Sequence, residues 1–241
     1  MQIFSKIDIG RMRSSNQDAY FTGELSDGAV FAVVCDGMGG ANAGNVASES
    51  AVKIISEYIL KSYRTNMGFT DIERMLINAI SSANIEIYDM SLKSPELSGM
   101  GTTAVVTVVR GNSAAIAHVG DSRAYLVNDD IKQLTRDHSV VQSLVEKGEL
   151  TPNEAKVHPR KNVITRALGA EENIMCDSDI ISINNGESLL LCTDGLSNFI
   201  EVSEMLNIFK TKKIEDVAEI LVDTANENGG GDNIAVVTIT L

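Results

Sequence analysis

The chain has 241 residues, of which 44% are apolar and 22% are charged, and these fractions are typical of a soluble globular protein rather than a disordered one. Asp and Glu number 33 against 20 Lys and Arg, so the net charge is −13. That charge argues against non-specific binding to DNA, RNA or anionic lipid, whose phosphates would be repelled. It still allows a phosphorylated ligand in a local pocket.

The sequence carries no pattern of a membrane segment or an exported protein. No apolar stretch reaches the roughly 18 residues of a transmembrane helix, and residues 1–10 lack the basic-then-apolar order of a signal peptide. Cys35, Cys176 and Cys192 follow no CxxC or CxxH spacing, which suits a reducing compartment and offers neither a disulfide framework nor a zinc site. We therefore expect a cytoplasmic protein, with residues 1–241 forming one domain.

Taken in chain order, the apolar patterns begin with a strand and two helices. A valine-rich run over 30–35, ended by Asp36-Gly37, predicts a buried strand. Apolar residues three and four apart then predict helices over 43–63 and 72–87. Four short apolar runs follow, joined by polar connections too short for a crossover helix, and they predict an antiparallel meander. These runs cover residues 104–109, 113–119, 123–127 and 131–134.

The rest of the chain adds helices and strands in alternation. Thr151-Pro152-Asn153-Glu154 predicts a capping box at the start of a short helix. Strands are expected at 188–192 and 234–239, with an amphipathic helix at 214–225 between them that Gly229–Gly231 ends. This order indicates an α+β protein rather than a doubly wound α/β one, and we expect a sheet-on-sheet core flanked by helices.

Aspartates recur where these apolar strands begin or end. Asp36, Asp121 and Asp194 follow strands, Asp232 precedes one, and Asp18 lies just before the apolar residues 19–21. Taken singly, each is an ordinary turn residue. Taken together, they predict an acidic cluster whose repulsion requires a cation or protonation. Oxygen ligands select Mg²⁺, Mn²⁺ or Ca²⁺, and two such ions sharing a water would suit hydrolysis of a phosphate ester.

The glycines that follow the first of these aspartates allow the backbone to approach such a cluster closely. They stand at positions 37, 39, 40 and 44, and such a turn would allow the Gly37 carbonyl to face a metal. An ordinary glycine-rich turn without a ligand has the same composition. The spacing matches neither GxGxxG nor GxxxxGK[ST], which disfavours a nucleotide-binding turn.

Nine motifs then occur in order between about residues 8 and 240. They are Gly10-Arg11-Met12-Arg13, Asn16-Gln17-Asp18, Asp36-Gly37-Met38-Gly39-Gly40, Gly101-Thr102-Thr103, His118-Val119-Gly120-Asp121-Ser122-Arg123, Leu134-Thr135-Arg136-Asp137-His138-Ser139, Asn162-Val163-Ile164-Thr165-Arg166-Ala167-Leu168-Gly169, Thr193-Asp194-Gly195 and Gly231-Asp232-Asn233. With these motifs the chain closely resembles the metal-dependent Ser/Thr protein phosphatases of type 2C, the PPM family, in their compact bacterial form.

The resemblance implies a four-layer α-β-β-α sandwich, in which two central antiparallel sheets are flanked by helices, and a variable flap at about 139–163. It implies a centre of two Mn²⁺ or Mg²⁺ ions, with a weaker third. By residue-level match Asp36 bridges the two ions, the Gly37 carbonyl binds one of them, and Asp194 and Asp232 bind the other.

Three further positions match functional residues of the same family. Asp121, shared with Asp194, matches the third-metal site of bacterial members, and Asp18 matches a residue that hydrogen-bonds a water ligand of a metal. Arg13 matches the arginine that holds the substrate phosphate. The resemblance thus implies hydrolysis of phosphoserine and phosphothreonine in proteins by an activated water or hydroxide, without a phosphoenzyme.

Two positions depart from the family pattern. Met38 stands where many eukaryotic members carry a histidine, a proposed general acid, so water or another group must supply any proton. Gln17 stands where many members carry glutamate. Cys35 and Cys192 are interpreted as buried apolar residues rather than nucleophiles. His118 and His138 are interpreted as structural.

The flap carries charged residues whose role the sequence leaves open. His158 is the histidine best placed to touch a substrate, although an exposed surface position fits it as well. Arg160-Lys161 would either meet a phosphoprotein or form part of a solvated loop. Family habit implies a partner Ser/Thr kinase, and we expect a monomer.

Three other classes of function would each be recognised by a feature of the sequence. A non-catalytic phosphoprotein-binding or regulatory module with the same fold would lack some of the expected aspartates, and none is missing. A two-metal hydrolase of nucleic acid would carry a basic stripe, against the negative charge. An NTPase would carry a Walker A lysine.

Overall fold

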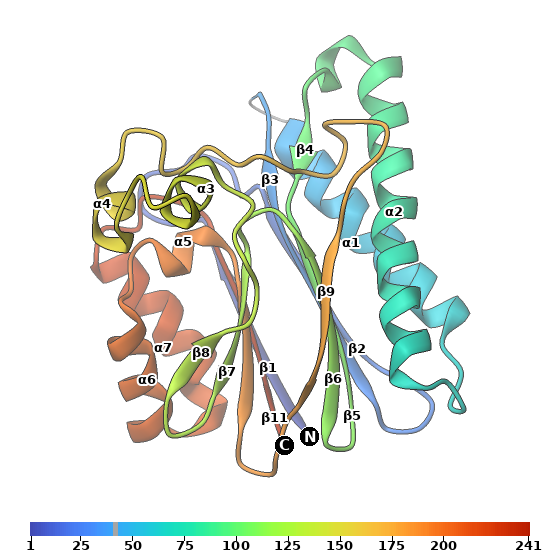
Figure 1. Ribbon diagram of the computed structural model, residues 1–241, viewed down its shortest axis with the longest axis vertical. Helices are drawn as coiled ribbons and strands as arrows, with labels where there is room; N and C mark the ends of the chain where they lie inside the picture. Colours follow the sequence, from blue (N-terminus) through green and yellow to red (C-terminus); the bar gives the residue numbers. More distant parts are fainter. Residues whose placement is uncertain (41–42) are drawn as a thin grey trace.

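The computed structural model describes residues 1–40 and 43–241. Two antiparallel sheets pack face to face at the centre, with α1 and α2 covering the outer face of one and α6 and α7 the outer face of the other (Figure 1). The expected α-β-β-α sandwich is therefore confirmed. None of the helices in the described ranges has both the length and the apolarity to cross a membrane.

The first sheet contains five strands in the order β1-β11-β10-β7-β8. The second sheet has the order β2-β3-β5-β6-β9, and β4 pairs with the end of β3. The strand bounds are β1 Gln2–Asp8, β2 Asp18–Glu24, β3 Val30–Met38, β4 Gly101–Thr102, β5 Ala104–Arg110, β6 Ser113–Val119, β7 Arg123–Val127, β8 Ile131–Gln133, β9 Asp177–Ser182, β10 Ser188–Cys192 and β11 Ile234–Thr240.

The helices carry the outer layers and the segment above the sheets. They are α1 Ala43–Ser62, α2 Phe69–Lys93, α3 Val140–Glu146, α4 Pro152–Val157, α5 Asp194–Ser197, α6 Val202–Thr211 and α7 Ile214–Glu227, with a short 3-10 turn at Pro95–Leu97. The predicted helices at 43–63, 72–87 and 214–225 are confirmed. Thr151 and Glu154 form the predicted capping box at the start of α4.

Three apolar layers hold the sandwich together, one between the sheets and one beneath each pair of helices. Along β3, Val30, Ala32 and Val34 face the opposite sheet, whereas Phe31 and Val33 face α1 and α2. Because both faces of this strand are buried, its sequence is a continuous apolar run rather than an alternating one. Burying each of its valine and phenylalanine side chains contributes about 1.5–3 kcal/mol.

The predicted meander is wrong at its centre. The second of its runs, β6, pairs with β5 and β9, whereas the third, β7, pairs with β10 and β8 in the other sheet. The connection Gly120-Asp121-Ser122 crosses between the sheets instead of turning a hairpin. Three residues span about 10 Å, which is the spacing of packed sheets. Gly120 makes the turn at a φ of 100°, which favours glycine.

β3 is also longer than predicted, because it continues through Asp36-Gly37 to Met38. Asp36 pairs with Asp18 on β2, and Gly37 pairs with Thr102 on β4. A Cβ at position 37 would lie 2.1 Å from the carbonyl oxygen of Gly44, so only glycine lets the strand pass the start of α1.

Candidate metal centre

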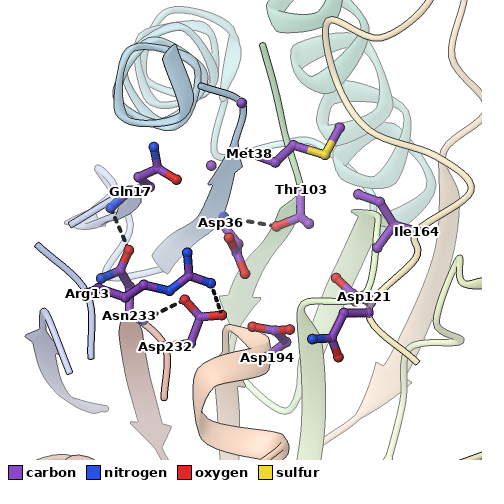
Figure 2. Close-up of a pocket in the computed structure, with 13 residues that line it drawn as sticks. Arg13, Gln17, Asp36, Met38, Thr103, Asp121, Ile164, Asp194, Asp232 and Asn233 are labelled. Carbon is purple, nitrogen blue, oxygen red and sulfur yellow. Dashed lines mark hydrogen bonds and ion pairs between the residues drawn. The ribbon is translucent and has the colours of Figure 1, made fainter. Parts of the chain in front are cut away.

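A polar pocket of about 250 Å³ lies at one end of the two sheets (Figure 2). The end of β3, the connection after β6, the start of α5 after β10 and the turn before β11 all border it. Because β10 and β11 are antiparallel neighbours, the end of one and the start of the other lie at the same edge. The topology therefore gathers side chains that are far apart in the sequence.

Asp36 is held by its backbone on both sides, so that its carboxylate is left facing the pocket. Its N–H donates to Thr103 Oγ1 at 2.9 Å, and its carbonyl accepts from Thr102 Oγ1 at 2.8 Å and from the Thr103 N–H at 2.9 Å. The Thr103 hydroxyl also lies 2.6 Å from the hydroxyl of Ser122. This contact joins the Asp36 strand to the crossing connection that carries Asp121.

Asp18 lies directly opposite Asp36 on β2 and is only 7% exposed. Its Oδ2 accepts a hydrogen bond from Thr193 Oγ1 at 2.8 Å. The Thr193 hydroxyl in turn accepts from the N–H of Ala235 at 2.9 Å, which fixes its proton toward Asp18. Burial, followed by the charges of nearby carboxylates, raises the pKa of Asp18 well above its ordinary value.

Asp194 begins α5 and has one satisfied carboxylate oxygen. Its Oδ2 accepts from Asn198 Nδ2 at 3.0 Å. Its Oδ1 is buried and accepts no hydrogen bond from any residue that the structure describes. A buried unpartnered carboxylate oxygen costs about 1–3 kcal/mol or more, so it indicates a missing partner.

The glycine after Asp194 allows the close packing that this placement needs. A Cβ at Gly195 would lie 1.8 Å from the carbonyl oxygen of Asn233, so the two segments Thr193-Asp194-Gly195 and Gly231-Asp232-Asn233 touch through their backbones. This contact brings Asp194 and Asp232 to the same side of the pocket (Figure 2).

Arg13 is the cation of the pocket. Its Nη2 donates to Asp232 Oδ2 at 2.7 Å, and about half of its side chain is exposed at the mouth. Asn233 fixes the segment that carries it: the Asn233 side chain accepts from the Gln17 N–H at 2.8 Å and donates to the carbonyls of Ile9 and Ser15 at 2.8 Å and 3.0 Å.

The carboxyls of the pocket oppose one another's ionisation. Burial is the main cause that raises the pKa of Asp36, Asp121 and Asp194, and the neighbouring negative charges raise them further. The pKa of Asp121 rises to about 7. Divalent cations would remove this repulsion, and the all-oxygen donor set together with the unpartnered Asp194 oxygen fits hard cations such as Mn²⁺ or Mg²⁺.

The structure brings the sequence-predicted site residues together. Arg13, Asp36, Gly37, Asp121, Asp194 and Asp232 line the pocket, and Asp18 lies beside Asp36 on the neighbouring strand. Thr103, Thr193 and Asn233 were not assigned a role by the sequence reasoning, although all three stand within the motifs that it singled out. Only their place in these motifs marks them in the sequence. Their hydrogen bonds join segments that are far apart in the chain, so no local pattern of residues predicts those bonds.

The structure also places the two residues that depart from the family pattern and the two cysteines that were predicted to be buried. Met38 lines the pocket and carries no proton to donate. Gln17 Nε2 donates to the Gly40 carbonyl at 3.4 Å. Cys35 and Cys192 are buried in β3 and β10, and burial raises both thiol pKa values, that of Cys192 to about 12. Such thiols are poor nucleophiles at neutral pH.

His118, His138 and Asp177 form a second group with the geometry to hold a metal ion. A guanidinium already supplies the positive charge there: Arg166 Nη1 donates to Asp177 Oδ1 at 2.8 Å and lies 3.0 Å from His138 Nε2. His138 Nδ1 accepts from the N–H of Gly120 at 3.1 Å. His138 therefore links the crossing connection to β9, in agreement with the structural role predicted for it.

The flap contributes one residue to the lining of the pocket, Asn162, and Ile164 follows directly after the flap and lines the pocket as well. His158 does not line the pocket, and its Nδ1 accepts from the N–H of Arg160 at 3.1 Å. Arg160 and Lys161 are exposed. The two ends of the flap are joined by a bridge between Ser139 and Ile164. Ser139 directly follows His138, which binds the crossing connection at Gly120.

Comparisons with known proteins give one consistent result. The model of the family Protein phosphatase 2C matches residues 11–230. The chain is 39% identical to the Serine/threonine phosphatase stp of Listeria innocua over 236 residues, which cover 97% of this chain and 93% of that protein.

Solved structures agree with the sequence match. The serine/threonine phosphatase of S. agalactiae superposes with a TM-score of 0.93 at 34% identity, covering 100% of this chain and 99% of that one. The catalytic domain of the serine threonine protein phosphatase PstP, solved in complex with 2 manganese ions, has a TM-score of 0.84 at 29% identity, covering 98% of this chain and 96% of that one.

Proposed function

The chain belongs to the protein phosphatase 2C family, and on that premise we propose that it hydrolyses phosphoserine and phosphothreonine at a centre of two divalent cations, Mn²⁺ or Mg²⁺. It is a metal-dependent Ser/Thr phosphatase whose substrates are phosphorylated proteins. The observation that carries the proposal is the buried, unpartnered Oδ1 of Asp194, which lies among the other carboxylates of one pocket.

We assign the ligands that the family resemblance implies, because the residues concerned all border that pocket. Asp36, the Gly37 carbonyl, Asp194 and Asp232 would hold the two cations, with Asp36 contributing to both. Asp121, with Asp194, would hold a weaker third. When bound, the cations lower the pKa of a water molecule and neutralise charge on the phosphate.

The chain's own residues bind and orient the reactants. The planar guanidinium of Arg13 at the pocket mouth matches two oxygens of a phosphate. Asp18, fixed by the Thr193 hydroxyl, accepts a hydrogen bond from water and orients it for attack on phosphorus. The Ser or Thr oxygen leaves on the opposite side. Because Met38 has no proton to give, water or another group supplies any proton that the leaving oxygen needs. The attack by water makes a phosphorylated side chain unnecessary.

The family and the composition of the chain suggest the partner and the setting that we propose next. A protein phosphatase of this kind opposes a Ser/Thr kinase, which supplies its phosphorylated substrates. The net charge of −13 disfavours nucleic acid as a substrate. Three cysteines without a disulfide among the described residues suit the cytoplasm. We further propose that residues 1–241 act as one monomeric catalytic domain with residues 139–163 as its flap.

Phosphate release from a phosphothreonine peptide tests the proposal. Protein stripped of metal with EDTA should be inactive and should regain turnover with Mn²⁺. Asp36→Asn should abolish that turnover, whereas Asp89→Asn, an exposed aspartate on α2, should retain it. Turnover by metal-free protein would contradict the mechanism. Mn²⁺ binding without phosphate release would favour the alternative, a regulatory module that binds phosphoproteins.

A further inference from the structure

A second hollow of about 440 Å³ lies beside the metal centre. Apolar side chains form much of its lining, with one carboxylate at its rim: Met38, Ile164, Ala167, Ile174, Met175 and Glu171. Met175 is 71% exposed, so its side chain is accessible to a molecule that enters the hollow. A set of accessible apolar groups beside a polar pocket indicates a binding surface rather than a packing defect.

The hollow is continuous with the metal centre. Met38 and Ile164 line both. Figure 2 shows these two side chains on the side of the pocket opposite Arg13. A phosphorylated residue whose phosphate reaches Arg13 would therefore have its neighbouring residues beside Met38 and Ile164. An extended peptide advances about 3.3–3.6 Å per residue, so a residue within two or three positions of the phosphoresidue reaches the hollow.

The wall of the hollow is held in place before any substrate arrives. Asn84 on α2 is 1% exposed, and its Nδ2 donates to the carbonyls of Glu171 and Glu172 at 3.0 Å each. Its Oδ1 accepts from the N–H of Gly169 at 2.8 Å. Leu168 pairs with Thr102 in the strand next to β3. A preformed wall reduces the ordering cost of binding.

The chemistry of the lining selects the occupant. Methionine side chains adapt to apolar groups of different shape, so Met38 and Met175 suit Leu, Ile, Val or Met rather than one residue alone. Glu171 at the rim would repel an acidic residue. The guanidinium of Arg166, which also borders the hollow, is already paired with Asp177. No free positive charge is therefore offered to a second phosphate by this arginine.

We propose that this hollow, the 164–175 groove, binds an apolar side chain that flanks the phosphorylated Ser or Thr of the substrate, and that it discriminates against an acidic one. The inference rests on the proposed function, because it names the substrate sequence that the same site prefers.

A scan of phosphothreonine peptides tests the groove. Leu is placed in turn at each of the three positions before and after the phosphothreonine in a Ser-rich peptide, and kcat/KM is measured with Mn²⁺. At one or two positions Leu should raise kcat/KM by about tenfold, the range that apolar pockets give. Asp at the same position should lower it. Met175→Asp should remove the preference for Leu, and Glu171→Lys should remove the discrimination against Asp.

Two comparisons make the test decisive. p-Nitrophenyl phosphate has no flanking residues, so Met175→Asp should hydrolyse it at the wild-type rate. Leu60→Asp, at an exposed apolar position in the last turn of α1, should keep the preference for Leu. Equal kcat/KM for all wild-type peptides, or a preference that Met175→Asp leaves intact, would overturn the inference. Failure of wild-type protein to hydrolyse any peptide would instead overturn the proposed function.

Discussion

The guanidinium of Arg13 is paired with the carboxylate of Asp232 at 2.7 Å, although the two residues are 219 positions apart in the chain. Asp232 is also one of the oxygen donors proposed for the cations. Under this proposal the same carboxylate would be shared between the arginine and a cation. A cation that neutralised Asp232 would then release the guanidinium of Arg13 to bind phosphate.

Arg13→Ala should impair phosphopeptide binding rather than metal binding. A hydrogen bond to a charged group contributes about 1.5–3 kcal/mol, so KM should rise about tenfold to a hundredfold. Mn²⁺ affinity should stay equal or become tighter, because Asp232 loses its competing arginine. Steady-state kinetics and calorimetric titration measure the two effects. Arg13→Lys, which keeps the charge without the fork, should give an intermediate KM. Unchanged kinetics would remove Arg13 from the site.

Asp121→Ala should lower turnover while two metal ions remain bound. Asp121 lies on the connection that crosses between the sheets, whereas Asp36, Asp194 and Asp232 lie on other segments and keep their hydrogen bonds to Thr103, Asn198 and Arg13. Calorimetry with Mn²⁺ counts the sites, and a phosphopeptide assay measures the rate. If this variant lost every metal ion, a separate third site at Asp121 would be contradicted.

The acidic cluster should make the metal-free protein less stable as pH rises. Folding raises the pKa of Asp121 from about 4 to about 7, so the folded protein favours the protonated carboxyl. That contribution is complete at acidic pH and is lost as pH rises through about 7. The melting temperature of EDTA-treated protein should therefore fall between pH 5 and pH 8, by about 2–4 °C for each kcal/mol lost.

Two controls isolate this effect. His138 acts in the opposite direction, because its pKa is lowered and its contribution is lost as pH falls. Asp121→Asn removes one titrating carboxyl and leaves His138 in place, so its melting temperature should fall less steeply with pH than that of the wild type. Added Mn²⁺ should raise the wild-type melting temperature most at pH 8, where the ligands are deprotonated. If the melting temperatures of the wild type and of Asp121→Asn fell equally steeply with pH, this account of the cluster would be contradicted.

Local pattern was enough to predict much of the fold. The continuous apolar run of β3 and the three- and four-residue spacing of α1, α2 and α7 arise from burial within single elements, and each is visible in a short window. β1 and β9 were missed because they are edge strands that are largely half-buried or exposed, with mixed polarity. The crossing connection was misread because a three-residue link fits either a hairpin or a step between packed sheets.

The sequence predicted which residues form the candidate site, but not the hydrogen bonds that hold them in place. Strand ends marked Asp36, Asp121 and Asp194 as rim carboxylates, and the resemblance to a family assigned their roles. The bonds from Thr193 to Asp18 and from Asn233 to the Arg13 segment join residues 175 and more than 200 positions apart. No periodicity records such contacts. The 164–175 groove was missed for the same reason, since it forms only when the segment after the flap lies beside Met38.

Gly195→Ala should destabilise the metal centre through packing alone. The added Cβ would lie 1.8 Å from the carbonyl oxygen of Asn233, so the segments that carry Asp194 and Asp232 must separate. Overpacking of this kind costs about 1–3 kcal/mol, which should appear as a lower melting temperature and as weaker Mn²⁺ binding together. Gly68→Ala is the matched control, because its Cβ would have its nearest neighbour at 3.9 Å. If Gly195→Ala bound Mn²⁺ as tightly as the control, the backbone contact between the two segments would not be what positions the pair of carboxylates.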